Sequence, residues 1–360
     1  MVAMLFVVIL HVSGVGGVNK AYPLHSAGYI TALLLRSVTF CAVNCYALIS
    51  GYVGCTGKKT AKKHTLGILN IFVQTLFWSF IISLIFFACG KTGWKGLVKC
   101  FFPIMTGQYW YASAYIGLLL FAPLLDRLLQ SLSAKMIRFV ECTVFLISIY
   151  LTVFCLGDPF GLSSGYSTLW LMLLYLLGGC IRLDPDFRDL LKKHSVLICA
   201  VCWGITWLGT YFVQIITSRI FGEPRFDGFL LRYVSFPTLL VACALLAAFA
   251  SKNLTLPGWL QKAAKCSFGV YLIHVHPLVF VYLLSDKFIF FADTPFFIMF
   301  FGVLAASAAI YALCTLIEYA RQLLFKVTHS EAILERISVA ICRSAEKTLA
   351  VFQKWISKSA

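Results

Sequence analysis

Long apolar stretches recur along almost the whole chain, separated by short polar segments. Ten of them are candidate membrane helices, at residues 1–18, 29–53, 67–89, 109–126, 139–156, 166–181, 195–218, 231–250, 267–284 and 296–320. A helix needs about 20 mostly apolar residues to cross about 30 Å of hydrocarbon. Strands with open edges cannot satisfy their backbone groups in a bilayer. We therefore predict an all-α integral membrane protein with about ten spanning helices.

The basic residues of the loops predict the orientation. An even number of spans places both termini on one side of the membrane, and 21 of the 30 lysines and arginines then fall on that side, against eight on the other. Cytoplasmic loops of membrane proteins carry an excess of Lys and Arg. We therefore expect both termini in the cytoplasm. The net charge of +16 then reflects orientation and not binding to nucleic acid.

The composition is typical of a membrane domain and not of a soluble one. Hydrophobic residues make up 61% of the chain and charged residues 12%, whereas soluble domains have about 45–50% and about 25%. We expect one polytopic membrane domain over residues 1–325 and a basic amphipathic cytoplasmic tail over residues 326–360. The 14 cysteines lie mostly inside apolar stretches, which indicates packing and not a disulfide framework or a zinc site. No metal is expected.

Two segments outside the spans have amphipathic patterns. Residues 91–108 combine aromatic and aliphatic side chains with glycines and lysines, which suits a short amphipathic or re-entrant piece at the outer surface. Residues 331–358 repeat apolar side chains near one helical face, with Lys and Arg opposite. That period predicts an interfacial helix on the cytoplasmic leaflet, with a disordered basic tail as the alternative.

Polar side chains inside the spans are the best candidates for chemistry, because each is costly in hydrocarbon. They are His11, Arg36, Asn44, Ser50, Gln74, Glu141, Gln214, His274, His276 and Glu318. A lone histidine at bilayer depth, such as His11, either makes a hydrogen bond between helices or has a functional role. The residues alone leave both readings open.

The end of the second span combines small residues with a run of lysines. Ser50 and Gly51 predict a close approach of two helix backbones. Lys58, Lys59, Lys62 and Lys63 follow directly. This run is a positive-inside signal, a contact with anionic lipid, or a site for the phosphates of a nucleotide-bearing donor.

Four stretches, taken in order, resemble motifs of the acyltransferase 3 family of bacterial membrane proteins. They are AMLFVVILHVSG at 3–14, NCYALISGY at 44–52, YWYASAYIGLLLFAPLL at 109–125 and SFGVYLIHVHPLV at 267–279. The resemblance implies a ten-span protein of the cytoplasmic membrane. It implies transfer of an acyl group, typically acetyl, from cytoplasmic acyl-CoA to a hydroxyl of a cell-envelope glycan or a lipid-linked sugar.

The resemblance also implies that His11 is the catalytic base. The ordinary pKa of histidine, about 6.5, suits a base at neutral pH. In the family an Arg precedes this His by ten intervening residues, and here it would fall one place before Met1. We therefore expect the true start to lie upstream of Met1, and the activity of the chain as given to depend on this point.

Further roles follow from the same resemblance. Ser50 and Asn44 are expected to orient the imidazole or to donate to an oxyanion, and acyl-CoA is expected to place its phosphates near the four lysines and Arg36. The expected acceptor entrance is lined by Trp110, Tyr111, Tyr115 and His274. Each has a plainer reading, namely packing, a hydrogen bond between helices or an interfacial aromatic belt.

Other functions remain open to the sequence. His274 and His276 lack a third ligand, which excludes a zinc site. The main alternative is a non-enzymatic membrane domain that moves a small substrate such as serine, of the kind fused to amino-acid racemases. A glycan or lipid-carrier flippase would need a larger polar cavity than these few groups suggest.

Overall fold

The computed structural model describes residues 1–360 except 58–59, 155–156, 227, 253–254 and 360, and side chains up to residue 348. The described residues form helices and no strand. Seven segments are long and apolar enough to cross a membrane. They are α1 with α2 (Val2–Ser13, Val18–Ala21), α3 with α4 (Ala27–Thr39, Ala42–Gly54), α5 (Ala61–Ala88), α7 (Trp110–Ser131), α8 (Ala134–Val153), α11 (Ser195–Phe221) and α16 (Phe296–Val327).

Two bent segments raise this number to nine if each is one span. The pair α9 (Thr168–Leu183) and α10 (Pro185–Lys193) bends by 95°, and α14 (Ser267–His274) bends by 58° against Pro277–Asp293. The bent second part contains α15 (Pro277–Val279), the π-helix η2 (Phe280–Leu284) and the 3₁₀ helix η3 (Ile289–Asp293). The other elements are α6 (Trp94–Lys99), η1 (Ser163–Gly165), α12 (Phe236–Ala250), α13 (Gly258–Lys265) and α17 (Ser330–Ser359).

Each of the ten predicted apolar stretches contains a helix or a pair of helices, so the all-α, multi-pass membrane class is confirmed. The number of crossings and the side on which the termini lie stay predictions. The segment predicted at 231–250 is the least span-like, because α12 has only 15 residues. The boundary predicted at residue 325 falls inside α16, which continues to Val327.

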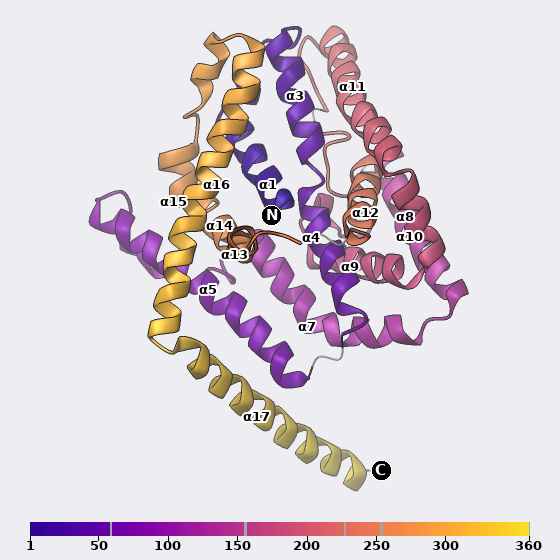
Figure 1. The fold of residues 1–360 in the computed structure, drawn as a ribbon, viewed down its shortest axis with the longest axis vertical. Helices are drawn as coiled ribbons and strands as arrows, with labels where there is room; N and C mark the ends of the chain where they lie inside the picture. Colours follow the sequence, from indigo (N-terminus) through magenta and orange to yellow (C-terminus); the bar gives the residue numbers. More distant parts are fainter. Residues whose placement is uncertain (58–59, 155–156, 227, 253–254, 360) are drawn as a thin grey trace.

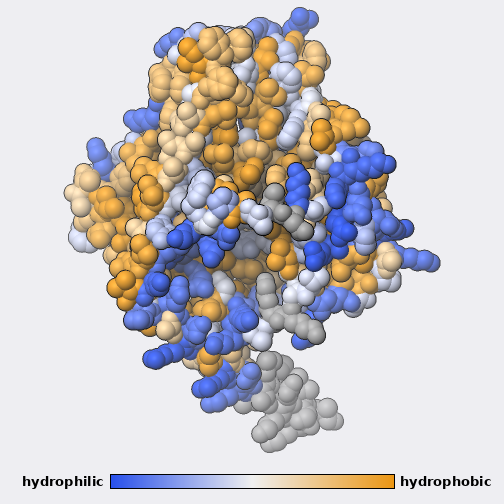
Figure 2. Space-filling model, in the orientation of Figure 1, coloured by the Kyte–Doolittle hydropathy of each residue, from blue (hydrophilic) through white to orange (hydrophobic). Residues whose placement is uncertain are grey.

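Figure 1 shows how the helices are arranged. The N-terminus lies near the middle of the molecule, and α17 leaves the lower end as a separate helix below α5. Figure 2 shows hydrophilic residues gathered over the lower half of one face and hydrophobic residues over most of the upper half.

Glycines bring α4 and α9 into close contact. A Cβ atom at Gly51 would lie 1.8 Å from the carbonyl oxygen of Tyr175, and one at Gly178 would lie 2.1 Å from that of Leu48. Only a residue without a Cβ allows the two backbones to pack so closely, as is common between membrane helices. The close approach predicted from Ser50 and Gly51 is confirmed, and it fixes the helix that carries Ser50.

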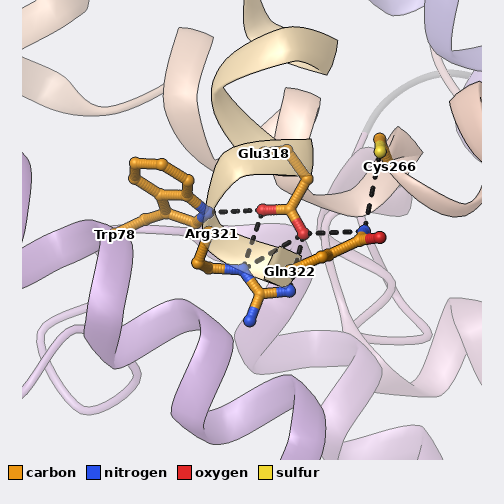
Figure 3. A network of polar contacts seen from close by, with 5 residues as sticks. All are labelled: Trp78, Cys266, Glu318, Arg321 and Gln322. Carbon is orange, nitrogen blue, oxygen red and sulfur yellow. Dashed lines mark hydrogen bonds and ion pairs between the residues drawn. The ribbon is translucent and has the colours of Figure 1, made fainter. Parts of the chain in front are cut away.

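A buried ion pair fixes the position of α14 (Figure 3). The Glu318 carboxylate is fully buried, and it accepts hydrogen bonds from Trp78 of α5 at 2.8 Å, from Arg321 at 2.6 Å and from Gln322 at 3.0 Å. A Cβ at Gly269 of α14 would lie 2.3 Å from Glu318. Because removing one partner of a buried pair typically costs about 3–5 kcal/mol, this network is a firm anchor for α5, α14 and α16.

The predicted tail helix is present as α17, but it also packs on protein. Leu334 and Ser338 are buried, and Thr65 of α5 lies 3.5 Å from the sulfur of Cys342. The Lys62 ammonium lies 3.7 Å from the Glu335 carboxylate. One face of α17 therefore contacts α5, which the prediction of a helix lying on the lipid leaflet did not include.

Candidate active site

A cavity of about 940 Å³ runs through the centre of the helix assembly. It follows α1 from Met4 to Gly14, a distance of about 15 Å at 1.5 Å per residue. Asn19 and Lys20 line it beyond the C-terminal end of α1, whereas Ser50 lines it from the C-terminal half of α4 and Gln74 from the middle of α5. Such a volume lies at the upper end of the range for small-molecule sites, about 300–1,000 Å³.

His11 lies in the wall of this cavity and is held by His274. The Nδ1 atom of His11 is 3.0 Å from Nε2 of His274, and Nδ1 of His274 is 2.6 Å from the carbonyl oxygen of Val270. Phe280 contacts the His11 ring edge-on, with ring centroids 5.0 Å apart. The sequence analysis placed His274 at the acceptor entrance; the structure makes it the direct partner of His11.

The carbonyl oxygen of Val270 determines the tautomers of both histidine rings. A carbonyl oxygen only accepts, so Nδ1 of His274 carries a hydrogen and, in the neutral ring, Nε2 is an acceptor. Nδ1 of His11 then donates to it, which leaves the lone pair of a neutral His11 on Nε2. We call Val270 O, His274 and His11 the histidine chain. It prepares His11 Nε2 to accept a proton.

Four tyrosines form a cluster in the same cavity. We call Tyr46, Tyr111, Tyr115 and Tyr271 the tyrosine cluster; the ring centroid of Tyr111 lies 5.7–6.1 Å from those of the other three. The hydroxyls of Tyr46, Tyr111 and Tyr271 are buried without a hydrogen bond of normal geometry. An unpaired buried hydroxyl is costly, so these three are suited to hydrogen bonds with a ligand.

Ser50 belongs to this cluster and not to the histidine chain. Its hydroxyl donates to the carbonyl oxygen of Tyr46 at 2.8 Å and lies 2.9 Å from the hydroxyl of Tyr115. Since the hydrogen of Ser50 is used, Tyr115 donates to it. Ser50 thus lines the cavity. The residue that contacts the His11 imidazole is His274, and not Ser50 as the sequence analysis expected.

Asn44 has a different task from the one expected. Its amide nitrogen donates to the carbonyl oxygen of Tyr233 at 2.8 Å, and its amide oxygen accepts from the indole of Trp170 at 3.1 Å. The side chain is fully buried and does not line the cavity. The plainer reading, a hydrogen bond between helices, is the one that the structure supports, because both polar ends of the amide are occupied.

The aromatic residues predicted at the acceptor entrance meet in the cavity. Trp110, Tyr111 and Tyr115 all line it, and Trp110 stacks on Tyr233 with ring centroids 6.0 Å apart. The sequence analysis did not find Tyr233, Tyr46 or Tyr271. Tyr46 and Tyr271 gave a usable signal, since they lie inside the second and fourth motifs, whereas Tyr233 lies outside all four.

The predicted phosphate-binding residues do not form one group. Arg36 lines the cavity, whereas Lys62 lines a separate groove next to α17. Lys63 follows at the start of α5, and Lys58 and Lys59 lie outside the described residues. The structure thus separates Arg36 from Lys62.

His276 is a structural residue. Its Nδ1 accepts from the backbone amide of Leu278 and so caps α15. Cys199 and Cys202, which have a CxxC spacing, are buried on α11. Among the described residues, no three His, Cys, Asp or Glu side chains are grouped to hold a metal ion.

Comparison with known families shows the family to which the chain belongs. A family model described as an acyltransferase domain, Acyl_transf_3, matches residues 1–318. The chain belongs to the acyltransferase 3 family. It is therefore a multi-pass membrane acyltransferase, as the four motifs indicated. Neither the comparison with curated proteins nor the comparison with solved structures gives a match. The match covers the histidine chain and the tyrosine cluster, whereas α17 lies beyond it.

Proposed function

We propose that this acyltransferase moves an acyl group, with acetyl the expected one, from cytoplasmic acyl-CoA to a hydroxyl of a cell-envelope glycan or lipid-linked sugar. The observation that carries the proposal is the contact between His11 and His274 at 3.0 Å, because it leaves Nε2 of a half-buried base in the cavity wall free to accept a proton. The cavity around it is large enough for the reacting ends of two substrates.

The proposed reaction uses His11 as base and then as acid. Nε2 of His11 takes the proton of the acceptor hydroxyl while that oxygen attacks the thioester carbonyl carbon. The tetrahedral intermediate collapses, the carbon–sulfur bond breaks, and the CoA sulfur receives the proton from Nε2. The products are the ester and free CoA, and His11 returns to its starting state.

The tyrosine cluster supplies hydrogen bonds in this scheme. Among the described residues the Tyr111 hydroxyl has no hydrogen-bond partner, and the Tyr271 hydroxyl makes no hydrogen bond of normal geometry; both rings line the cavity. Preorganised donors in a dry site stabilise developing negative charge or fix a polar substrate. We therefore assign them to oxygen atoms of the substrates, and we assign the stacked Trp110 and Tyr233 to the apolar faces of the acceptor.

The length of the cavity supports transfer between the two sides of the membrane. Lys20 in the cavity wall forms an exposed ion pair with Asp286 at 3.1 Å, whereas Gln74 lines the cavity from the middle of α5. A donor and an acceptor that enter from opposite ends meet beside His11. We place the enzyme in the cytoplasmic membrane, with the glycan outside and membrane lipids around it.

The test measures transfer of labelled acetyl groups from acetyl-CoA to envelope glycans in membranes that contain the protein. His11→Ala should lower the rate by about 10²–10⁴-fold, the contribution of a general base. His25→Ala is the matched control, because His25 is exposed between α2 and α3 and does not line the cavity. Equal transfer by His11→Ala and the wild type contradicts the proposal. Serine uptake without any transfer would favour the transport alternative.

A further inference from the structure

A second concave site lies between α5 and α17. It is a groove of about 450 Å³, and it shares no lining residue with the cavity that holds His11. Three basic side chains line it, Lys62 from α5 and Arg336 and Arg343 from α17, together with the carboxylate of Glu335. We call this site the basic groove. Its volume lies within the range of small-ligand sites.

The charges of the basic groove favour an anion. Lys62 and Glu335 are 3.7 Å apart with side chains 47% and 56% exposed, and such exposed pairs are weak. No salt bridge is found for Arg336 or Arg343 among the described residues. Guanidinium groups match the oxygens of phosphate in a bidentate way. A phosphate can therefore bind both arginines and replace Glu335 as the partner of Lys62.

Helix α5 connects the basic groove to the cavity. Lys62 lies in the groove and Gln74 lies in the cavity wall. These positions are twelve residues apart, which corresponds to about 18 Å along a helix. The extended pantetheine arm of CoA can cover such a length. Twelve residues also turn a helix by about 120° beyond whole turns, so the two side chains lie on different sides of α5. In this proposal the pantetheine arm passes the N-terminal end of α5, next to Lys62, and brings the acyl end into the cavity.

Lipid contact uses a different face of α17. Ile333, Ile337 and Ile341 recur every four residues and are 42–54% exposed, so they form one apolar stripe. Arg336 and Arg343 lie elsewhere around the helix, at the groove. The stripe fits the bilayer, and the concave basic groove fits a compact phosphate-bearing molecule.

We propose that the basic groove binds the nucleotide phosphates of the acyl-CoA donor and that Arg336 and Arg343 of α17 complete this site. The proposal rests on the proposed function and adds a contribution from outside residues 1–318, the part that matches the family. Glu335 competes with the phosphates for Lys62. The tail is thus a part of the donor site and not only a membrane contact.

The test measures binding of CoA, of its nucleotide part 3′-phosphoadenosine 5′-diphosphate, and of pantetheine to the full-length protein in neutral-lipid nanodiscs. The double variant R336Q/R343Q should weaken CoA and the nucleotide by about 10- to 100-fold and leave pantetheine unchanged. Glu335→Gln should tighten CoA by a few-fold, because it removes a like charge. Lys347→Gln is the control, since Lys347 lies on α17 outside the groove.

The outcomes separate this proposal from the proposed function. Wild-type affinity of R336Q/R343Q for CoA, with acetyl transfer still dependent on His11, overturns the basic groove alone. Loss of binding to phosphatidylglycerol vesicles without loss of CoA affinity also overturns it and assigns the arginines to lipid. No acetyl transfer and no CoA binding by the wild type overturn both. An unchanged melting temperature of the variant shows that any lost affinity does not come from unfolding.

Discussion

On α1 and α14 the polar groups beside the cavity are joined to one another, whereas between α4 and α7 only Ser50 and Tyr115 are joined and other tyrosine hydroxyls are not. In the histidine chain, His11 and His274 use three of their four ring nitrogens within the protein. In the tyrosine cluster, the hydroxyls of Tyr46 and Tyr111 have no hydrogen-bond partner in the part of the chain that the structure describes. Groups that the protein satisfies are held in one orientation for chemistry. Groups that it leaves unsatisfied need a ligand.

Replacement of His274 is expected to give the largest effect beyond loss of His11 itself. His274→Ala removes the acceptor for Nδ1 of His11, so the ring loses its orientation and its tautomer. We expect the rate of acetyl transfer to fall by about 10²-fold, part of the contribution of a general base. The measurement is the initial rate with labelled acetyl-CoA at saturating donor.

A conservative variant separates orientation from packing at this position. His274→Gln keeps a carbonyl oxygen that can accept from His11. It should recover a large part of the rate that His274→Ala loses. Equal losses in the two variants, with equal melting temperatures, would show that the ring volume of His274 matters and its hydrogen bond does not.

Removal of an unpaired tyrosine hydroxyl should give a smaller effect. Tyr111→Phe is expected to lower kcat/KM by about 2- to 12-fold, the worth of one hydrogen bond of about 0.5–1.5 kcal/mol. The melting temperature should not fall, because the Tyr111 hydroxyl has no partner to lose. Steady-state kinetics and a thermal melt on the same preparation check both statements.

Tyr115→Phe is the matched comparison, since Tyr115 donates to Ser50. We expect it to lower stability by about 1 kcal/mol. If Tyr111→Phe is the more destabilising of the two, then the Tyr111 hydroxyl has a partner in the protein, and its assignment to a substrate is wrong.

Asn44 should matter least for the chemistry. Asn44→Ala leaves the Trp170 indole and the Tyr233 carbonyl without their partners, so we expect a loss of about 2–3 kcal/mol of stability. The rate per folded molecule should change by only about twofold, because the site does not use the amide. A drop of 100-fold per folded molecule would restore Asn44 to the catalytic group.

Much of the fold can be predicted from the sequence, because apolar length alone selects helices in a bilayer. The same is true of Gly51, where a small residue beside Ser50 indicates close packing. His11 was also a reasonable candidate, since a histidine at bilayer depth is costly. Each of these signals comes from residues that are close together in the sequence.

The partners of these residues could not be predicted in the same way. His11 and His274 are 263 residues apart, and no local pattern joins them. Asn44 and Ser50 looked alike in one motif, yet α4 turns Ser50 to the cavity and Asn44 to Trp170. The amphipathic period of residues 331–358 predicted the helix α17. It did not predict that α17 packs on α5, because an apolar helix face fits lipid and protein equally well.

The most direct measurement is a double-mutant cycle on acetyl transfer with His11→Ala, His274→Ala and the combined variant. If His274 acts only through His11, the combined variant is as slow as His11→Ala alone, within about threefold, because residues of one catalytic unit are not additive. Losses that multiply, so that the combined variant is slower by the full factor of His274→Ala, would contradict the histidine chain as the working unit of this acyltransferase.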